Sequence, residues 1–251
     1  MRLRAALSAA LLTAGVVLAT AAPAGAVANG ADVPEGRYEF AAKLTMPEIP
    51  NADGTTYASA CSAALIAPQW IITAGHCFHD VDRNPVSGPV PYATSVLLGT
   101  TAQEDGAGET RNVTEVRQSG KNDVALAKLD KPVTDIEPLS VDGSAPTVGQ
   151  RVTLAGWGSL TSTNPAPSTK LQQGIMRVSE VAATSVGVVG LAPRRTTSAC
   201  PYDSGAPYFV PDGDGGKLVS VESTGPDCPH ADAETTSRVD VIADWIASYT
   251  E

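Results

Sequence analysis

Short apolar runs, separated by Gly, Pro, Asn and Asp, fill most of the chain between residues 38 and 190. They are YEFAAKLT, YASACSAALIA, WIITA, TSVLLG, VTEVR and VALAKL, followed by RVTLAGWG, LQQGIMRVS and VGVVG. Runs of this length, bounded by turn residues, are typical of β-strands. No stretch of useful length with a helical period interrupts them before residue 129. The pattern predicts an antiparallel barrel or sandwich.

The last residues follow a different pattern. Val239, Ile242 and Ile246 recur at spacings of three and four, and Ser237 precedes them as a candidate N-cap. This arrangement predicts an amphipathic C-terminal helix whose apolar side packs on the rest of the protein.

The beginning of the chain is not expected to belong to the fold. Arg2 and Arg4 precede an apolar, alanine-rich run over residues 5–22, and residues 24–26 read Ala-Gly-Ala. A charged start, an apolar stretch and a small-x-small site are typical of a secretory signal peptide. We therefore expect residues 1–26 to be removed and the protein to be secreted. A membrane anchor is the weaker interpretation, because Ser and Thr interrupt the run and alanine adds little transfer energy.

Residues 27–251 have the size of one two-lobed domain or two small ones. The segment 130–150 is rich in Pro, Gly, Ser and Asp and is expected to connect two lobes. The formal net charge of the chain is −10. Nucleic acids and anionic membranes attract clustered Lys and Arg, so we expect neither as a partner.

Four cysteines in an exported chain favour two disulfides over a metal site. Their spacings do not match a zinc motif, although spacing alone leaves three connectivities open. We expect no cofactor and no metal.

The segment CPYDSGAP at residues 200–207 contains the candidate nucleophile, Ser204. A serine hydroxyl becomes nucleophilic only when an imidazole takes its proton and a third group orients that imidazole. TAGHC offers His76 and NDVALAKL offers Asp123. The order His, Asp, Ser along the chain is that of the chymotrypsin type and differs from subtilisins and α/β-hydrolases. An α/β-hydrolase esterase is also disfavoured because the serine lies in D-S-G-A and not in G-x-S-x-G.

Together these motifs resemble the trypsin-like, chymotrypsin-fold serine peptidases, of the bacterial secreted type. TAGHC corresponds to T/S-A-A/G-H-C, DVAL to D-I-A-L and YDSGAP to G-D-S-G-G-P. The resemblance implies an all-β fold of two antiparallel six-stranded β-barrels with a C-terminal α-helix. Residues 27–135 would form the barrel that carries His76 and Asp123, and residues 136–251 the barrel that carries Ser204, together one peptidase domain.

The resemblance also implies the activity. The protein would be a secreted serine endopeptidase that hydrolyses protein or peptide substrates through an acyl-enzyme. His76 would act as general base and then general acid, while Asp123 would accept the Nδ1 hydrogen of the imidazole. Protein protease inhibitors are expected as further partners, and the protein is expected to be a monomer without membrane contact after signal cleavage.

Two further features follow from the resemblance. The disulfides would join Cys61 to Cys77 and Cys200 to Cys228. The α-amino group of Val27, freed by cleavage after Ala26, would turn inward and pair with Asp203. We hypothesise that signal peptidase itself creates this activating terminus, because no propeptide is recognisable before it. Ala21 and Ala24 also lie in cleavable contexts, and cleavage there would leave a short pro-segment.

The clearest departure from the family pattern is Tyr202. The family places Gly there, and the backbone N–H groups of that residue and of Ser204 form the oxyanion hole. If the backbone requires a positive φ, Tyr carries a steric cost that Gly avoids. A catalytically weak or inactive homologue that acts as a binding protein is therefore the alternative function, and Thr224, where the family has Trp, favours it too.

Specificity is open at this stage. Ser198 falls where the family sets the floor of its primary pocket, and its neutrality suggests apolar or aromatic substrate side chains. Glu234 falls near the pocket wall, where it could attract Lys or Arg, but aligning it needs a gap and we expect it to be exposed. Ser223, Thr224 and Gly225 resemble the S-W-G edge that binds the substrate backbone.

Three polar features are assigned no function. Glu104, Asp105 and Glu109 lie where some relatives carry a calcium loop, but Thr100 replaces the first acidic ligand, so solvated charge is expected. His79 and His230 are expected at the surface.

Overall fold

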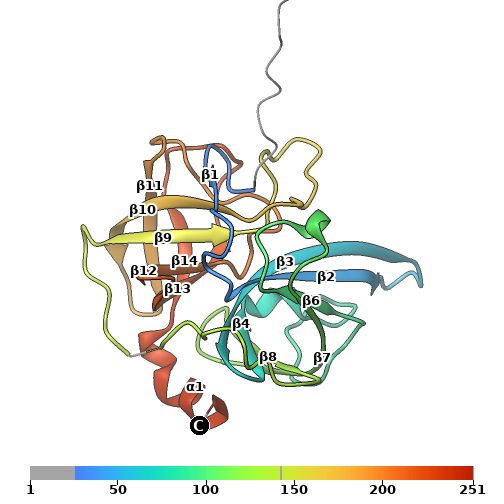
Figure 1. Cartoon of the computed structure of the whole chain (residues 1–251). Helices are drawn as coiled ribbons and strands as arrows, with labels where there is room; N and C mark the ends of the chain where they lie inside the picture. The colour runs from blue at the N-terminus through green and yellow to red at the C-terminus, as the bar shows by residue number, and fades with distance from the viewer. Residues whose placement is uncertain (1–25, 142, 251) are drawn as a thin grey trace, which may run out of the picture.

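A computed structural model describes residues 26–141 and 143–250. The predicted signal peptide therefore lies, apart from Ala26, outside the described residues. Two antiparallel sheets stand side by side, and the single α-helix of the described part lies at the C-terminal end (Figure 1). The mostly β fold with two barrels is confirmed.

The first barrel is built from the first half of the chain. Within the described residues its sheet has the order β5-β7-β6-β2-β3-β4-β8, and pairing of β7 with β8 closes six of the strands. The strands are β2 (Ala41–Pro50), β3 (Thr56–Ala67), β4 (Trp70–Thr73), β5 (Gly88–Pro89), β6 (Ser95–Leu98), β7 (Glu109–Gln118) and β8 (Ala125–Leu129). Each of the six closing strands corresponds to one of the apolar runs of the sequence.

The second barrel follows the connection at residues 130–150. Its order, in the described part of the chain, is β1-β10-β11-β14-β13-β12-β9, closed by pairing of β10 with β9. The strands are β1 (Ala31–Asp32), β9 (Arg151–Gly156), β10 (Gln172–Val181), β11 (Ser185–Ala192), β12 (Pro207–Asp212), β13 (Gly215–Thr224) and β14 (Glu234–Arg238). The short β1 belongs to the start of the chain, so the residues just after the predicted cleavage site lie against the second barrel.

An aromatic cluster joins the two barrels. Phe209 on β12 packs edge-on against Tyr38 and Phe40, with ring centroids 4.9 Å and 5.1 Å away. All three side chains are buried. Edge-to-face packing of this kind adds to the area that each ring removes from water. The barrels therefore meet through a buried aromatic contact.

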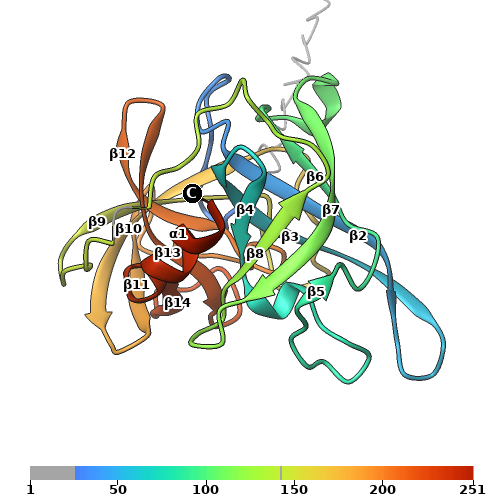
Figure 2. The same cartoon turned by 90° about the horizontal axis from the view of Figure 1, so that it is seen from below.

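The C-terminal helix α1 (Ala243–Thr250) is shorter than the sequence pattern suggests. A single 3-10 turn, η3 (Asp240–Ile242), precedes it. Ser237 does not cap the helix, because it lies in β14 and pairs with Ser185 and Val221 on either side. The predicted apolar side is nevertheless buried, and Tyr249 reaches Trp70 of the first barrel at 5.6 Å between ring centroids. Figure 2 shows the helix from below.

Two disulfides tie loops to the barrels, Cys61 to Cys77 and Cys200 to Cys228. Both pairings are those that the family resemblance implies, and together they use all four cysteines. Among the described residues, no helix is long and apolar enough to cross a membrane.

Candidate active site

His76 lies in a short 3-10 helix, η1 (Gly75–Cys77), that directly follows β4. The disulfide at Cys77 fastens this turn to β3. The turn keeps the imidazole accessible, with 47% of the side chain exposed. A candidate base therefore stands at the surface on a covalently anchored turn.

Asp123 lies just before β8 and holds His76 through two atoms. Its Oδ1 accepts the backbone N–H of His76 at 2.8 Å, and its Oδ2 lies 2.7 Å from Nδ1 of the ring. The hydroxyl of Ser223 also donates to Oδ2, at 2.6 Å. Burial raises the pKa of the Asp123 carboxyl, but the hydrogen bonds from His76 and Ser223 outweigh burial and the pKa is lowered. An ionised acceptor assigns the hydrogen to Nδ1 and leaves Nε2 free to accept a proton.

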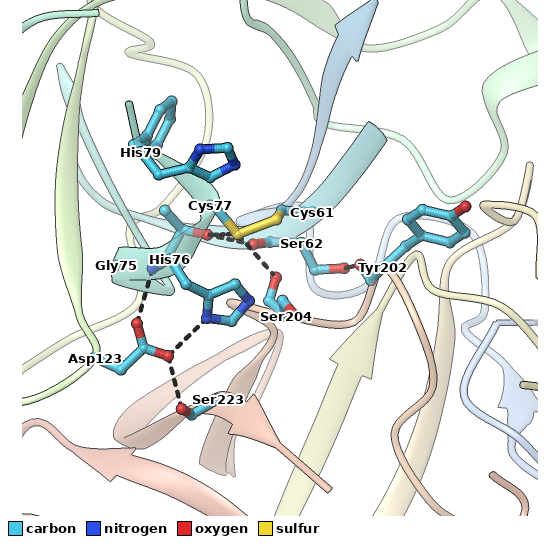
Figure 3. Close-up of a disulfide and its surroundings, with 12 residues drawn as sticks. Cys61, Ser62, Gly75, His76, Cys77, His79, Asp123, Tyr202, Ser204 and Ser223 are labelled. Atoms are coloured by element: carbon cyan, nitrogen blue, oxygen red, sulfur yellow. Dashed lines mark hydrogen bonds and ion pairs between the residues drawn. A yellow bond between two sulfur atoms is a disulfide. The ribbon is translucent and has the colours of Figure 1, made fainter. Parts of the chain in front are cut away.

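Ser204 comes from the second barrel, on the loop before β12. Its carbonyl accepts the backbone N–H of Ser62 on β3 at 2.9 Å. Gly205 allows this approach, since its φ is +86° and a Cβ there would lie 2.0 Å from Oγ1 of Thr73. Figure 3 shows Ser204 beside the imidazole of His76, on the side away from Asp123. The two lobes thus contribute separate parts of one arrangement.

The Ser204 hydroxyl makes no hydrogen bond to His76 among the described residues. Hydrogen bonds of this kind are often long in an uncomplexed site and tighten when substrate binds. His76 and Ser204 line the same cavity, so a substrate that enters it meets both.

Tyr202 has a φ of +77°. The backbone at this position therefore adopts the left-handed conformation for which Tyr is expected to carry a steric cost. A non-glycine residue in this region carries a steric cost. The backbone N–H groups of Tyr202 and Ser204 donate to no acceptor in the described part of the protein, whereas that of Asp203 between them donates to Cys200 at 2.9 Å. Two unpaired donors therefore flank Asp203, as an oxyanion site requires.

Ser62 holds this loop in place. Its hydroxyl donates to the Tyr202 carbonyl at 3.2 Å and accepts the backbone N–H of Trp157 at 2.9 Å. The hydroxyl is buried and spans the two barrels. The sequence analysis did not single out Ser62, although its place beside Cys61 put it next to a predicted disulfide.

Asp203 is completely buried behind the loop. It accepts the backbone N–H groups of Gly158 at 2.8 Å and Cys200 at 3.0 Å. Burial raises the pKa of its carboxyl to about 7, more than the N–H groups of Gly158, Cys200 and Val27 lower it. Within the described residues no cation pairs with this acid. Val27 is also fully buried, and its backbone lies against the carboxylate.

A cavity of about 310 Å³ opens beside Ser204. Predicted site residues that line it are His76, Cys200, Ser204, Ser223, Thr224 and Gly225. Ser198 is not among the lining residues. It is buried, its backbone N–H donates to Ala28 at 3.1 Å, and its hydroxyl accepts the backbone N–H of His230 at 3.3 Å.

The expectation that Glu234 is exposed was wrong. The side chain begins β14, lines the cavity and is 1% exposed. Two neighbours explain this placement, since the backbone N–H of Ala199 donates to Oε1 at 2.8 Å and Gly225 leaves room for the carboxylate. His79 was also expected at the surface but is buried, 3.3 Å from the Tyr57 hydroxyl.

Glu222, which the sequence analysis did not consider, lines the same cavity and is 4% exposed. The Tyr208 hydroxyl donates to its Oε2 at 2.6 Å. Its position directly before Ser223, in the segment that resembles the substrate-binding strand, was the feature of the sequence that could have indicated a place near the site.

The acidic loop near residue 105 closes on itself. Thr100 Oγ1 donates to the Asp105 carboxylate, 3.0 Å from Oδ2, and the backbone N–H of Ala107 donates to Oδ1 at 2.8 Å. No cluster of potential metal ligands occurs among the described residues.

Comparison with known proteins gives one matching family model, described as Trypsin, over residues 28–246. Trypsin eta of Drosophila erecta is 26% identical and is aligned over 95% of both chains. Transmembrane protease serine 5 of Homo sapiens is 25% identical over 88% of this chain, and Snake venom serine proteinase 14 of Crotalus adamanteus is 28% identical over 76%. The chain spans 50% of the human protein and 77% of the snake protein.

Proposed function

Because the chain belongs to the trypsin family of serine peptidases, we propose that it is a secreted serine endopeptidase that hydrolyses peptide bonds in proteins or peptides. The proposal rests on one observation: Asp123 holds the imidazole of His76, and His76 lines the same cavity as Ser204. The family relatives include a trypsin and a snake venom proteinase. We further propose that the protein is a monomer of the bacterial secreted type, with barrels at residues 27–135 and 136–251 and with protein inhibitors among its partners.

The geometry supports the following steps. Nε2 of His76 takes the proton of the Ser204 hydroxyl as the oxygen attacks the substrate carbonyl, and Asp123 stabilises the imidazolium. The unpaired N–H groups of Tyr202 and Ser204 stabilise the negative charge on the carbonyl oxygen. The imidazolium then gives its proton to the leaving amine, and an acyl-enzyme forms. Water, deprotonated by His76, hydrolyses the ester by the reverse sequence.

Val27 and Asp203 would set the active conformation. An α-ammonium group at Val27 would supply the cation that the buried Asp203 lacks, which stabilises the carboxylate form. The full burial of Val27 beside this acid supports the proposal. Sequencing the N-terminus of the secreted protein tests it, and a mature chain that begins at another residue contradicts it.

The positive φ of Tyr202 favours a second candidate, a weak or inactive homologue that acts by binding. Both N–H groups at the site remain unpaired, however, so the strain does not remove a donor. Loss of one oxyanion donor typically lowers the rate on the order of 10² to 10³-fold, so a distorted loop predicts a slow enzyme before a dead one.

A fluorophosphonate probe separates the two candidates. We expect the probe to label the wild type and not Ser204→Ala, because only an activated serine attacks the phosphorus. Ser162→Ala is a matched control, since Ser162 lines the same cavity without a role in the proposed chemistry. Equal absence of labelling in the wild type and Ser204→Ala would assign the protein to the binding class.

A further inference from the structure

The cavity beside Ser204 carries two buried acids. Glu222 comes from β13 and Glu234 from β14, neighbouring strands of the second barrel. No Lys or Arg is found among the described residues that line it. Two buried carboxylates beside one cavity cannot both ionise at low cost unless a cation or a proton accompanies them.

Glu234 directs an oxygen without a donor toward the cavity. Its Oε1 accepts the backbone N–H of Ala199, but Oε2 receives no hydrogen bond from the described residues. A Cβ on Gly225, a lining residue, would lie only 1.6 Å from Oε2. The oxygen therefore occupies the space above Gly225, at the cavity wall. A polar atom in this position is one that a ligand satisfies.

The contact between His230 and Glu234 is a second indication that the cavity holds a proton. Its Nδ1 lies 3.2 Å from the carbonyl of Asp232, which can only accept, so Nδ1 carries hydrogen. Its buried Nε2 has no hydrogen-bond partner, although it lies 3.0 Å from Oε1 of Glu234. A neutral imidazole and a carboxylate would place two acceptors face to face. The contact therefore favours a proton on one of the two side chains.

The pKa shifts of these side chains also favour a proton held by the two glutamates. Burial, and then repulsion by Glu234, raises the pKa of Glu222 well above its usual range, against the hydrogen bond from Tyr208. Burial also raises the pKa of Glu234 to about 8, and burial lowers the pKa of His230. The titratable groups that face this pair are Asp123, Asp203, Tyr208, Asp227, His230 and, across the cavity, His76.

We propose that the cavity is a proton-exchange pocket, in which the Glu222–Glu234 pair holds a proton when empty and gives it to solvent when a cationic substrate side chain enters. The cation is an ammonium or guanidinium group, which then donates to Oε2 of Glu234. Neutral side chains enter the protonated pocket instead. Preference for cationic over neutral residues before the cleaved bond therefore rises with pH. This inference rests on the proposed peptidase function only for its link to cleavage.

A binding experiment tests the pocket without catalysis. Benzamidinium and its neutral analogue benzamide are titrated calorimetrically into Ser204→Ala, in two buffers of different ionisation enthalpy, from pH 6 to 9. We expect benzamidinium to release about one proton near pH 6 to 7 and progressively fewer toward pH 9, while its affinity rises with pH. Benzamide should release none.

Variants locate the effect. Glu234→Gln, in the same background, should weaken benzamidinium binding on the order of 10²-fold and abolish proton release. Glu222→Gln should reduce the release while keeping most of the affinity. Glu180→Gln removes an exposed carboxylate from the same barrel and should change neither. Proton release that is absent from the parent protein, or unchanged in Glu234→Gln, overturns the proposal.

Cleavage provides the second readout. The ratio of kcat/KM for Lys and norleucine peptides isolates the ammonium group, because both reactions use the same Ser204 and His76. We expect this ratio to rise up to about tenfold per pH unit below pH 8 in the wild type and to be small and flat in Glu234→Gln. A flat ratio in an active wild type overturns the pocket proposal alone, whereas proton-linked binding without cleavage of either peptide overturns only the peptidase function.

Discussion

The two sides of the cleft treat their acids in opposite ways. On the side of the first barrel, Asp123 is 28% exposed and accepts three hydrogen bonds, and its pKa is lowered. On the side of the second barrel, Asp203 is fully buried with three backbone donors, and Glu222 and Glu234 are buried with one donor each from the described residues. The pKa values of all three are raised. The number of donors relative to burial, and not burial alone, decides which acid is ionised.

The backbone shows the same contrast. His76 and Asp123 have ordinary negative φ values, whereas Tyr202 and Gly205 are both left-handed. The carboxylate on the first side is satisfied, in part by Ser223 of the second barrel. Within the described residues the second side keeps a strained Tyr202, two free N–H groups and one oxygen of Glu234 without a donor. Unsatisfied groups near a cavity are where a ligand can gain interaction energy, so the second side is the one expected to distinguish substrates.

The largest expected effect is on kcat and comes from removing the carboxylate that orients His76. Asp123→Asn replaces the acceptor for Nδ1 with an amide and favours the wrong tautomer of His76. We expect kcat to fall on the order of 10⁴-fold, a magnitude carried over from chymotrypsin-type enzymes. Thermal unfolding should change little, which serves as the folding control. A loss of less than tenfold would show that Asp123 does not orient the base.

The next effect is on stability and concerns the buried Glu234 of the second barrel. The folded-state pKa of Glu234, about 8, lies above its ordinary value of 4.5, so between these values the folded protein binds the extra proton. Its stability is therefore greatest at low pH and falls as pH rises, by about 1.4 kcal/mol per pH unit for each such group. Denaturant unfolding at pH 6, 7 and 8 should show a shallower fall in Glu234→Gln than in the wild type. Identical slopes in both proteins would contradict the raised pKa.

A smaller effect is expected from relieving strain. Tyr202→Gly should raise the free energy of unfolding by about 1 kcal/mol, because glycine adopts positive φ without a Cβ clash. If the strain also displaces the N–H groups, kcat should rise up to about tenfold with little change in KM. Tyr202→Ala is the matched control, since it removes the ring but keeps the Cβ. An equal gain in both variants would assign the effect to the ring.

The smallest expected effect on kcat comes from Ser62, which links the two sides. Ser62→Ala removes the hydrogen bonds to the Tyr202 carbonyl and from the Trp157 N–H. We expect a loss of stability of about 1 to 3 kcal/mol, since both partners are left buried, and a decrease in kcat of a few-fold. Restored kcat in Ser62→Thr, which keeps the hydroxyl, would support a positioning role. An unchanged kcat in Ser62→Ala would limit Ser62 to stability.

The sequence predicted the strands and the helix because each depends on local pattern, whereas both disulfide pairings came from the resemblance to the family. The burial of Glu234 could not be predicted in this way. It depends on how the segment between Cys228 and β14 folds back, and an alignment gap falls there. Glu222 escaped notice because residues 218–222 of β13 are all buried, so alternation gives no inward face. The prediction that Ser237 caps the helix was wrong, because its pairing with two strands distant in sequence outweighs the local helix signals.

The aromatic contact of Phe209 with Tyr38 and Phe40 has a consequence for thermal denaturation. Neither barrel can melt alone without exposing these three rings to water, at a cost of several kcal/mol. Heating should therefore produce a single calorimetric transition, with hydrolytic activity and near-ultraviolet circular dichroism vanishing at the same temperature. Such cooperativity leaves no half-folded species with an open cleft, which protects a peptidase from digestion by neighbouring molecules of its own kind.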